Sequence, residues 1–278
     1  MARPLFNRSL SYTARLLGGT MLSAALLSGC TTLNGGEPSR PGLGAASDLP
    51  VHMTDPRDFV AAASYWGGVY EQNPQNAEAA AKYARGLRHL GSLQQALIVL
   101  QQAAAQHPND ANILAEYGKA LTASGKPDQA VALLAKAGVL LPTDWTILSA
   151  EGVALDEMGE HSRAKQKYDA ALQLAPEHPT VLTNLGLSYA LSGELARAEE
   201  TLRRAVANPA AGAHARQNLA LVLGLQGDFE EAERLARADL PPSLAVGNIS
   251  YLRNMLAQPA LWQQMEALDA PIAGPSAP

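Results

Sequence analysis

Five glycines recur at intervals of 34 residues through the middle of this 278-residue chain. Each stands between two stretches that have the apolar spacing of an amphipathic helix. Because one helical hairpin cannot bury its apolar face alone, a register kept over so many intervals predicts an array of stacked hairpins. The glycines are Gly91, Gly125, Gly159, Gly193 and Gly227.

Other positions keep the same register and indicate how the helices pack. A small residue such as Gly118 or Gly152 stands seven positions before each glycine, and an alanine such as Ala164 stands five positions after it. A larger residue such as Tyr168 follows four positions later in most repeats. Small side chains let two helix axes approach, and large ones fill the space between them. Prolines that cannot continue a helix end each second helix, and these are Pro74, Pro108, Pro142 and Pro176.

This pattern resembles the tetratricopeptide repeat, most closely at Leu185-Gly186, Tyr189, Ala198, Leu202 and Ala205. The resemblance implies an all-α solenoid with five full repeats, an N-terminal half repeat and C-terminal capping helices. We expect the array to cover residues 55–240, the capping helices 241–270 and a disordered tail 271–278. In the fifth repeat Ala236 replaces a large residue, so we expect looser packing there.

The first thirty residues have the layout of a secretory leader. Three arginines precede an apolar run over residues 16–27, and no acidic residue occurs before Glu37. The run ends in Leu27-Ser28-Gly29-Cys30, which resembles the lipobox of bacterial lipoproteins. This resemblance implies that residues 1–29 are removed as a signal peptide and that Cys30 carries the lipid. An ordinary signal peptide with an incidental cysteine is the alternative.

The residue after the cysteine indicates which membrane the lipid enters. It is Thr31 rather than the aspartate that retains many lipoproteins at the inner membrane. By the same resemblance, we expect an outer-membrane anchor with the repeats facing the periplasm. The lipidated cysteine and the Gly-, Pro- and Ser-rich segment after it, residues 30–54, are expected to form a flexible tether.

Charge and motifs argue against nucleic-acid binding and catalysis. Without the leader, 18 basic residues remain against 26 acidic ones, a net charge of −8, whereas nucleic-acid binding requires a basic face. The six histidines are scattered, and no Walker, G-x-S-x-G or G-x-G-x-x-G motif occurs. The acidic pair Asp156-Glu157 is expected on a solvated face. We therefore expect no enzyme activity, no cofactor and no metal site.

The resemblance places a binding groove on the first helix of each repeat. The N-terminal repeats offer Arg85, Arg88 and Lys119 to this groove, which can hold an acidic segment or a chain-terminal carboxylate. A merely solvated basic face is the alternative. The later repeats expose leucines that indicate contact with an apolar partner face, unless the C-terminal helices fold back over them. The groove residues expected there are Val153, Thr183, Leu187, Gln217, Leu221 and Leu225.

Two functions fit a lipid-anchored repeat groove. One is to pilot or escort an outer-membrane or secretion-system subunit, and the other is to gather cell-wall hydrolases as a periplasmic adaptor. The segment from Ala238 to Pro242, together with Asn248 to Leu256, is similar to the end of the TadD family. These are tetratricopeptide lipoproteins of tight-adherence (Flp) pilus assembly. That similarity implies a pilotin-like role toward an outer-membrane secretin.

Overall fold

The computed structural model describes residues 56–257, which form twelve α-helices and no strand. The all-α repeat architecture expected from the sequence is thereby confirmed. The predicted leader, Cys30, the tether and the tail lie outside the described residues, as does the end of the predicted capping segment. Within the described range, no helix is both long enough and apolar enough to cross a membrane.

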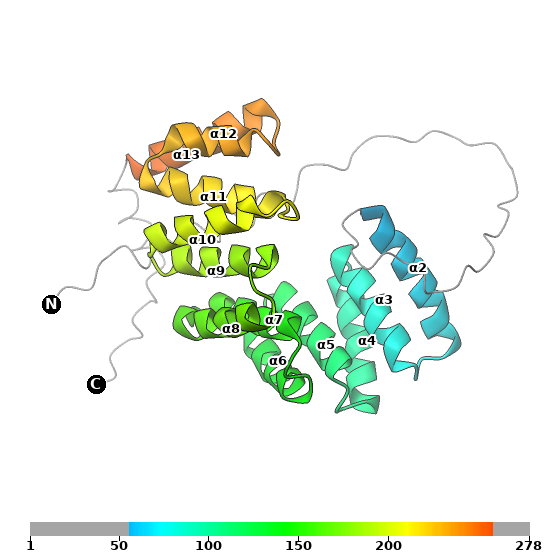
Figure 1. Ribbon diagram of the computed structural model, residues 1–278. Helices are drawn as coiled ribbons and strands as arrows, with labels where there is room; N and C mark the ends of the chain where they lie inside the picture. The colour runs from blue at the N-terminus through cyan, green and yellow to red at the C-terminus, as the bar shows by residue number, and fades with distance from the viewer. Residues whose placement is uncertain (1–55, 258–278) are drawn as a thin grey trace, which may run out of the picture. The chain divides into compact units, whose positions relative to one another are not determined.

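The described helices belong to two compact units, which we call the N-terminal unit (residues 56–141) and the C-terminal unit (residues 142–257). The N-terminal unit consists of α2 (Pro56–Gln72), α3 (Ala77–His89), α4 (Leu93–Gln106), α5 (Ala111–Ala123) and α6 (Pro127–Leu140). Each of these helices packs on the next, and α3 also packs on α5 (Figure 1). The first helices of successive repeats therefore lie side by side.

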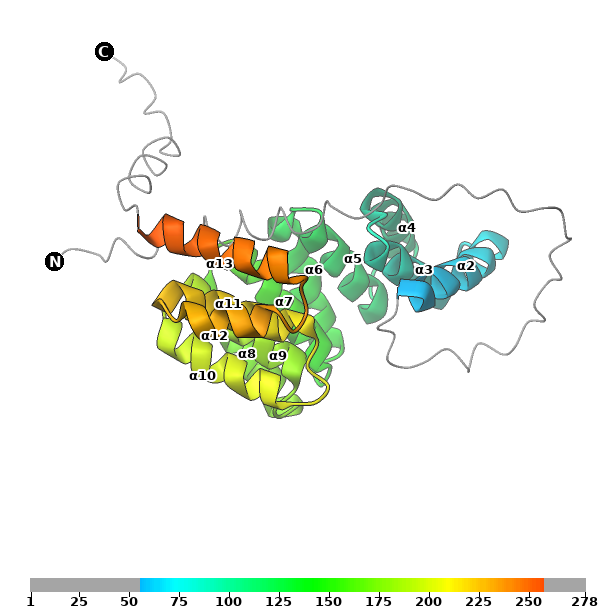
Figure 2. The same ribbon diagram turned by 90° about the horizontal axis from the view of Figure 1, so that it is seen from above.

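The C-terminal unit repeats this arrangement over seven helices. They are α7 (Trp145–Glu157), α8 (His161–Leu174), α9 (Pro179–Leu191), α10 (Leu195–Ala207), α11 (Ala213–Gln226), α12 (Phe229–Ala236) and α13 (Pro242–Leu256). Neighbours in sequence pack on one another, and α7, α9, α11 and α13 also pack in succession. Figure 2 shows α13 lying along α11 at the end of this unit.

Local sequence explains where the helices begin and end. The first helices α3, α5 and α7 follow Asn76, Asp110 and Asp144, whose side chains accept hydrogen bonds from backbone N–H groups of the first turn. The five periodic glycines all adopt positive φ, between 72° and 94°, where a side chain would cause strain. They form the turns between the two helices of each repeat.

The periodic small residues mark the closest helix contacts. A Cβ atom added to Gly118 would lie 2.5 Å from Leu134 Cγ, and one added to Gly152 would lie 2.5 Å from Tyr168 Cε1. Both distances are too short for carbon atoms, so these positions require glycine. Leu134 and Tyr168 are fully buried in the space that the glycines leave.

The helix after the fifth repeat, α13, packs on both helices of that repeat. The second helix of this repeat, α12, has only eight residues, and its Ala236 is buried. Leu252 of α13 packs against α11, since a Cβ atom added to Gly224 would lie 2.9 Å from Leu252 Cδ1. The capping helix α13 thus covers α11 beside Gly224, a contact that the repeat register does not predict.

Candidate binding surface on the first helices

The basic residues predicted on the N-terminal repeats surround the carboxylate of Glu116, which was not among the predicted groove residues. Glu116 of α5 is only 2% exposed. Its Oε1 accepts hydrogen bonds from Arg85 Nε (3.1 Å), Arg85 Nη2 (2.9 Å) and Lys119 Nζ (3.2 Å), and its Oε2 accepts one from Arg88 Nη2 (3.3 Å). We call these four residues the Glu116 cluster. Because α3 supplies both arginines and α5 the other two residues, the cluster joins two successive repeats.

The charges of the Glu116 cluster do not cancel. Burial alone would raise the pKa of the Glu116 carboxyl, but Lys119, Arg85 and Arg88 outweigh it and lower that pKa to about 2. Glu116 is therefore ionised at neutral pH, and three cations around one carboxylate leave a net charge of +2. Arg85 is the most accessible member, since 48% of its side chain is exposed against 20% for Arg88 and for Lys119.

His89 borders the Glu116 cluster. Its ring stacks on Phe59 of α2, with centroids 4.1 Å apart, and its Nε2 lies 3.4 Å from Arg88 Nη2. Partial burial and then the charge of Arg88 lower the pKa of His89 to about 4, against a smaller opposing effect of Glu116. The imidazole is therefore neutral at pH 7, and its Nε2 can accept a hydrogen bond from Arg88.

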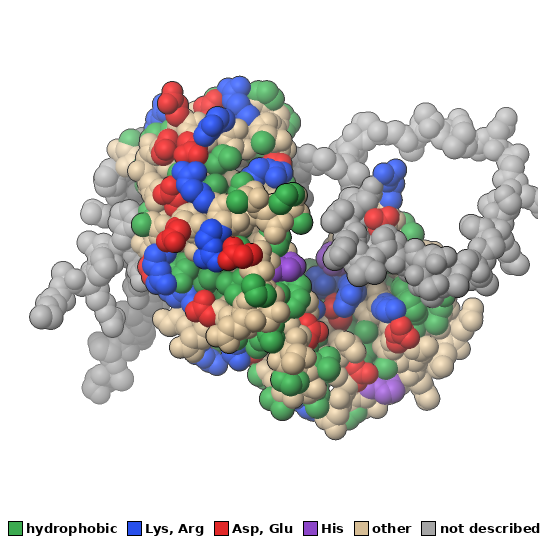
Figure 3. Space-filling model, viewed as in Figure 1, with side chains coloured by type: hydrophobic (Ala, Val, Ile, Leu, Met, Phe, Trp, Pro, Cys, Tyr) green, Lys and Arg blue, Asp and Glu red, His purple; other side chains and the backbone are tan. Residues whose placement is uncertain are grey.

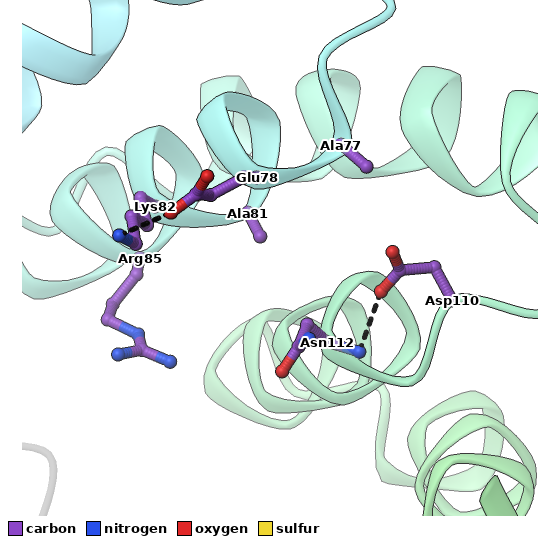
Figure 4. Close-up of a pocket in the computed structure, with 7 residues that line it drawn as sticks. All are labelled: Ala77, Glu78, Ala81, Lys82, Arg85, Asp110 and Asn112. Atoms are coloured by element: carbon purple, nitrogen blue, oxygen red, sulfur yellow. Dashed lines mark hydrogen bonds and ion pairs between the residues drawn. The ribbon is translucent and has the colours of Figure 1, made fainter.

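A cavity of about 330 Å³ lies beside Arg85, between α3 and the start of α5. Its acidic groups already have partners. Glu78 pairs with Lys82 at 2.7 Å, and Asp110 accepts hydrogen bonds from the first turn of α5. In Figure 4 the Arg85 guanidinium points away from the Glu78–Lys82 pair. The cavity lining comprises Ala77, Glu78, Ala81, Lys82, Arg85, Asp110 and Asn112.

In the C-terminal unit, the predicted groove leucines are less exposed than expected. Leu187, Leu221 and Leu225 are each half-buried. They lie on α9 and α11, which pack on each other, and α11 also packs on α13. The described C-terminal helix α13 packs on α11 and α12 and still leaves Leu221 and Leu225 with partial exposure.

The other predicted groove residues of this unit differ in accessibility. Val153 of α7 and Gln217 of α11 are half-buried. Thr183 is 8% exposed, and its hydroxyl donates to the Pro179 carbonyl at 2.7 Å. Thr183 therefore offers little surface to a partner, because it is buried and its hydroxyl is hydrogen-bonded within its own helix. The accessible apolar surface that we retain consists of Val153, Leu187, Leu221 and Leu225, which we call the leucine face.

The expectation that Asp156 lies on a solvated face is wrong. Its carboxylate is 9% exposed. It accepts hydrogen bonds from the hydroxyls of Tyr168 (2.9 Å) and Ser188 (2.8 Å), and it lies 2.8 Å from His161 Nδ1. Burial, and then the negative charge of Asp156, raise the pKa of Tyr168. Asp156 thus joins the third repeat to the fourth. The residues next to Asp156 in the sequence do not predict this contact.

Charged residues outside these sites mostly form ion pairs. Arg203 contacts both Glu199 and Glu231, and Arg216 Nε lies 2.8 Å from Asp239 Oδ2. Figure 3 shows acidic and basic side chains interspersed over the C-terminal unit. No group of His, Cys, Asp and Glu side chains within residues 56–257 is arranged to hold a metal ion.

Models of the tetratricopeptide repeat match most of the described chain. One model matches residues 54–115 and 87–144, a second matches 149–215, and a third matches 213–238. Together these ranges cover more than half of the sequence. The chain belongs to the tetratricopeptide-repeat family. Its stacked hairpins are a scaffold suited to protein–protein interaction.

Solved tetratricopeptide structures share this fold. PilW, a widely conserved type IV pilus biogenesis factor, is 20% identical over 69% of this chain and 91% of its own, with a TM-score of 0.60. TTC0263, a thermophilic repeat protein of Thermus thermophilus, is 22% identical over 60% of this chain and 91% of its own, with a TM-score of 0.54. No curated protein gives a significant match.

A third similar structure shows that the repeat fold alone does not determine which ligand a protein binds. Human IFIT1, determined as a dimer with m7Gppp-AAAA, is 19% identical over 64% of this chain and 45% of its own, with a TM-score of 0.57. One repeat architecture is thus found both in a pilus biogenesis factor and in a protein solved with a capped oligonucleotide. The function of this chain must therefore be argued from its own surface.

Proposed function

We propose that this protein is a lipid-anchored scaffold that binds an envelope protein, and that it acts as a pilotin-like assembly factor for a tight-adherence (Flp) pilus or a related secretion system. The observation that carries the proposal is the surface of the first helices. Each unit has its own such surface: the N-terminal unit presents the net positive Glu116 cluster, and the C-terminal unit presents the half-buried leucine face.

The choice of pilus assembly rests on two independent supports. The segments from Ala238 to Pro242 and from Asn248 to Leu256 are similar to the end of the TadD lipoproteins, and the second segment lies in α13. PilW, whose fold is similar, is itself a type IV pilus biogenesis factor. The partner we propose is therefore an outer-membrane secretin or another pilus assembly subunit.

The surface chemistry favours a scaffold over an enzyme. Glu116 and Asp156, two of the buried carboxylates at the first helices, are each held by several donors. A general base must instead be able to reach the proton that it abstracts. We propose that both carboxylates position repeats and that neither performs catalysis.

The proposed anchor is Cys30, which would place the protein at the outer membrane facing the periplasm. Cys30→Ser should prevent lipid attachment and release the array from the membrane without unfolding it. Cell fractionation, with circular dichroism of the released protein, tests this. A processed Cys30→Ser protein that still sediments with membranes would overturn the lipoprotein assignment.

The proposed partner class is tested by affinity purification from detergent-solubilised membranes, followed by mass spectrometry. We expect enrichment of a secretin or another pilus assembly subunit over a control purification that uses an unrelated lipoprotein. Enrichment of cell-wall hydrolases instead would contradict the pilotin-like role and favour an adaptor that gathers those enzymes.

A further inference from the structure

We propose that two copies of this protein associate through the outer face of α13, with the two helices antiparallel and crossing at Gly247. This face consists of Leu244, Gly247 and Tyr251, and we call it the α13 face. Self-association goes beyond the partner binding proposed above and does not depend on it. The α13 face is also separate from the leucine face, whose residues lie on α7, α9 and α11.

The α13 face points away from the helices on which α13 packs. These are α11 and α12, and the buried side of α13 includes Ile249 and Leu252. Because successive residues of a helix are about 100° apart, Gly247 lies nearly opposite that side. Leu244 and Tyr251 flank it and are 56% and 49% exposed. Figure 2 shows no other described helix of the C-terminal unit on the outer side of α13.

The glycine at the centre of this face is not explained by the contacts of the described residues. Gly247 has no positive φ, and a Cβ atom added to it would meet nothing within 4 Å. Glycine inside a helix is destabilising relative to alanine. Elsewhere in this protein, Gly118 and Gly186 make room for a leucine of the neighbouring helix. Gly247 therefore indicates that a further helix approaches α13 closely.

The spacing of the α13 face is self-complementary. Leu244 lies three residues before Gly247, and Tyr251 lies three residues after Asn248. When two such helices run antiparallel about a two-fold axis between residues 247 and 248, Leu244 of each copy meets Tyr251 of the other. The glycines let the helices approach at the crossing, and the large residues fill the space on both sides. This contact closes on itself, so it predicts a dimer rather than a filament.

The charge of the α13 face favours a second copy over an acidic or basic partner. Arg253 is the single charged residue of α13, and its guanidinium carbon lies 4.8 Å from the centroid of the Phe229 ring on α12. This contact holds Arg253 away from the α13 face. The chain has a formal net charge of −5, so two copies repel each other where acidic surfaces meet. An uncharged face avoids this repulsion.

The size of the face sets the expected affinity. Since α13 has 15 residues, it is about 22 Å long and about 10 Å wide. That footprint is smaller than the roughly 800 Å² that each partner buries in a standard interface. We therefore expect a reversible dimer with a Kd between about 1 μM and 1 mM.

Sedimentation equilibrium of the purified full chain, in a detergent matched to the solvent density, measures this association. Tyr251→Glu should weaken it about tenfold or more, because each copy then brings a negative charge to the contact. Val246→Glu is the matched control, because Val246 is 38% exposed on another side of α13. It adds the same charge and should leave the Kd unchanged. Circular dichroism melting checks that both variants keep the fold.

Gly247→Leu separates a close helix crossing from general apolar attraction. Leucine favours a helix and adds apolar surface to the face, so general attraction would strengthen the association. At a close crossing the same side chain keeps the helices apart. We therefore expect association at least about fivefold weaker, with a melting temperature equal to or above that of the unmodified protein.

Cross-linking tests the antiparallel arrangement. Leu244→Cys and Tyr251→Cys chains are treated with a short bismaleimide, each variant alone and the two mixed. The unmodified chain, whose single cysteine is Cys30, gives the background. The mixture should cross-link more than either variant alone, because the two-fold axis brings residue 244 of one copy to residue 251 of the other.

Several results would overturn the proposal. They are a full chain that stays monomeric up to about 1 mM, equal weakening by Val246→Glu and Tyr251→Glu, stronger association in Gly247→Leu, or no excess cross-linking in the mixture. Association that appears only when residues 258–278 are removed would instead assign the face to that segment. A monomeric chain whose Tyr251→Glu variant recovers less of an envelope protein from membranes would assign the face to that protein.

Discussion

Replacing Glu116 by glutamine removes the carboxylate that joins the first two full repeats. Glutamine keeps the size and one acceptor oxygen, but it leaves Arg85, Arg88 and Lys119 without an anionic partner. The fall in the Glu116 pKa from 4.5 to about 2 corresponds to about 3 kcal/mol of folded-state preference for the ionised form, at about 1.4 kcal/mol per tenfold change. We expect Glu116→Gln to destabilise the contact between α3 and α5 by about this amount.

Hydrogen exchange measured by mass spectrometry resolves this effect by segment. In a repeat array, helices open locally, and the exchange rate follows the population of the open state. A loss of about 3 kcal/mol predicts roughly 100-fold faster exchange for peptides from α3 and α5. Peptides from α9 to α11 in the C-terminal unit should exchange as in the unmodified protein.

Glu199→Gln is the matched control, because Glu199 is a partly exposed acid that pairs with Arg203 on the same helix. Glu199→Gln should change the free energy of local opening by no more than about 1 kcal/mol, as for other surface ion pairs. If Glu116→Gln changed the hydrogen-exchange rates of α3 and α5 by less than threefold, the argument that this carboxylate joins the two repeats would be refuted.

Two further predictions concern packing and pH. Gly152→Ala should cost about 1–3 kcal/mol, because the new Cβ would meet the Tyr168 ring at 2.5 Å. Gly68→Ala, which meets nothing within 4 Å, should be neutral or stabilising by up to about 1 kcal/mol. Equal melting temperatures for the two variants would contradict the packing account. Folding lowers the pKa of both His89 and Glu116, so the unfolded chain binds protons first and the N-terminal unit should lose stability as pH falls. His89 contributes to this loss between about pH 6.5 and 4, and Glu116 contributes below about pH 4.5. If the midpoint of urea unfolding of the N-terminal unit stayed constant or rose from pH 7 to 4, this pH prediction would be contradicted.

The helices of this protein could be predicted because their signals are local. Gly125 and Gly159 recur one repeat apart at turns with positive φ, and the helices before Pro108 and Pro142 each end two residues earlier. Turn geometry and helix termination depend on a few neighbouring residues, so the register carries them. Close contacts such as Gly152 with Tyr168 follow from the same register, because both residues belong to one hairpin.

The candidate sites were less predictable because they depend on distances between hairpins. The spacing of Glu116 and Lys119 indicates one helix face, but the approach of Arg85 depends on how α3 packs on α5. Asp156 looked solvated beside Glu157, yet Ser188 of the next repeat donates to it. Repeat spacing does not specify the side chains that meet across such contacts.

The central claim is that a protein partner binds the first-helix surface, and it is tested most directly by replacing two residues of the leucine face. Leu187→Ser with Leu221→Ser should lower recovery of the proposed protein partner from membranes by about tenfold or more, at about 1 kcal/mol or more for each anchoring residue. The control pair is Val60→Ser with Ile98→Ser, because these residues are 55% and 65% exposed on α2 and α4. It should leave recovery unchanged. If both pairs melt like the unmodified protein and recover the partner equally well, the partner does not bind the leucine face and the account is contradicted.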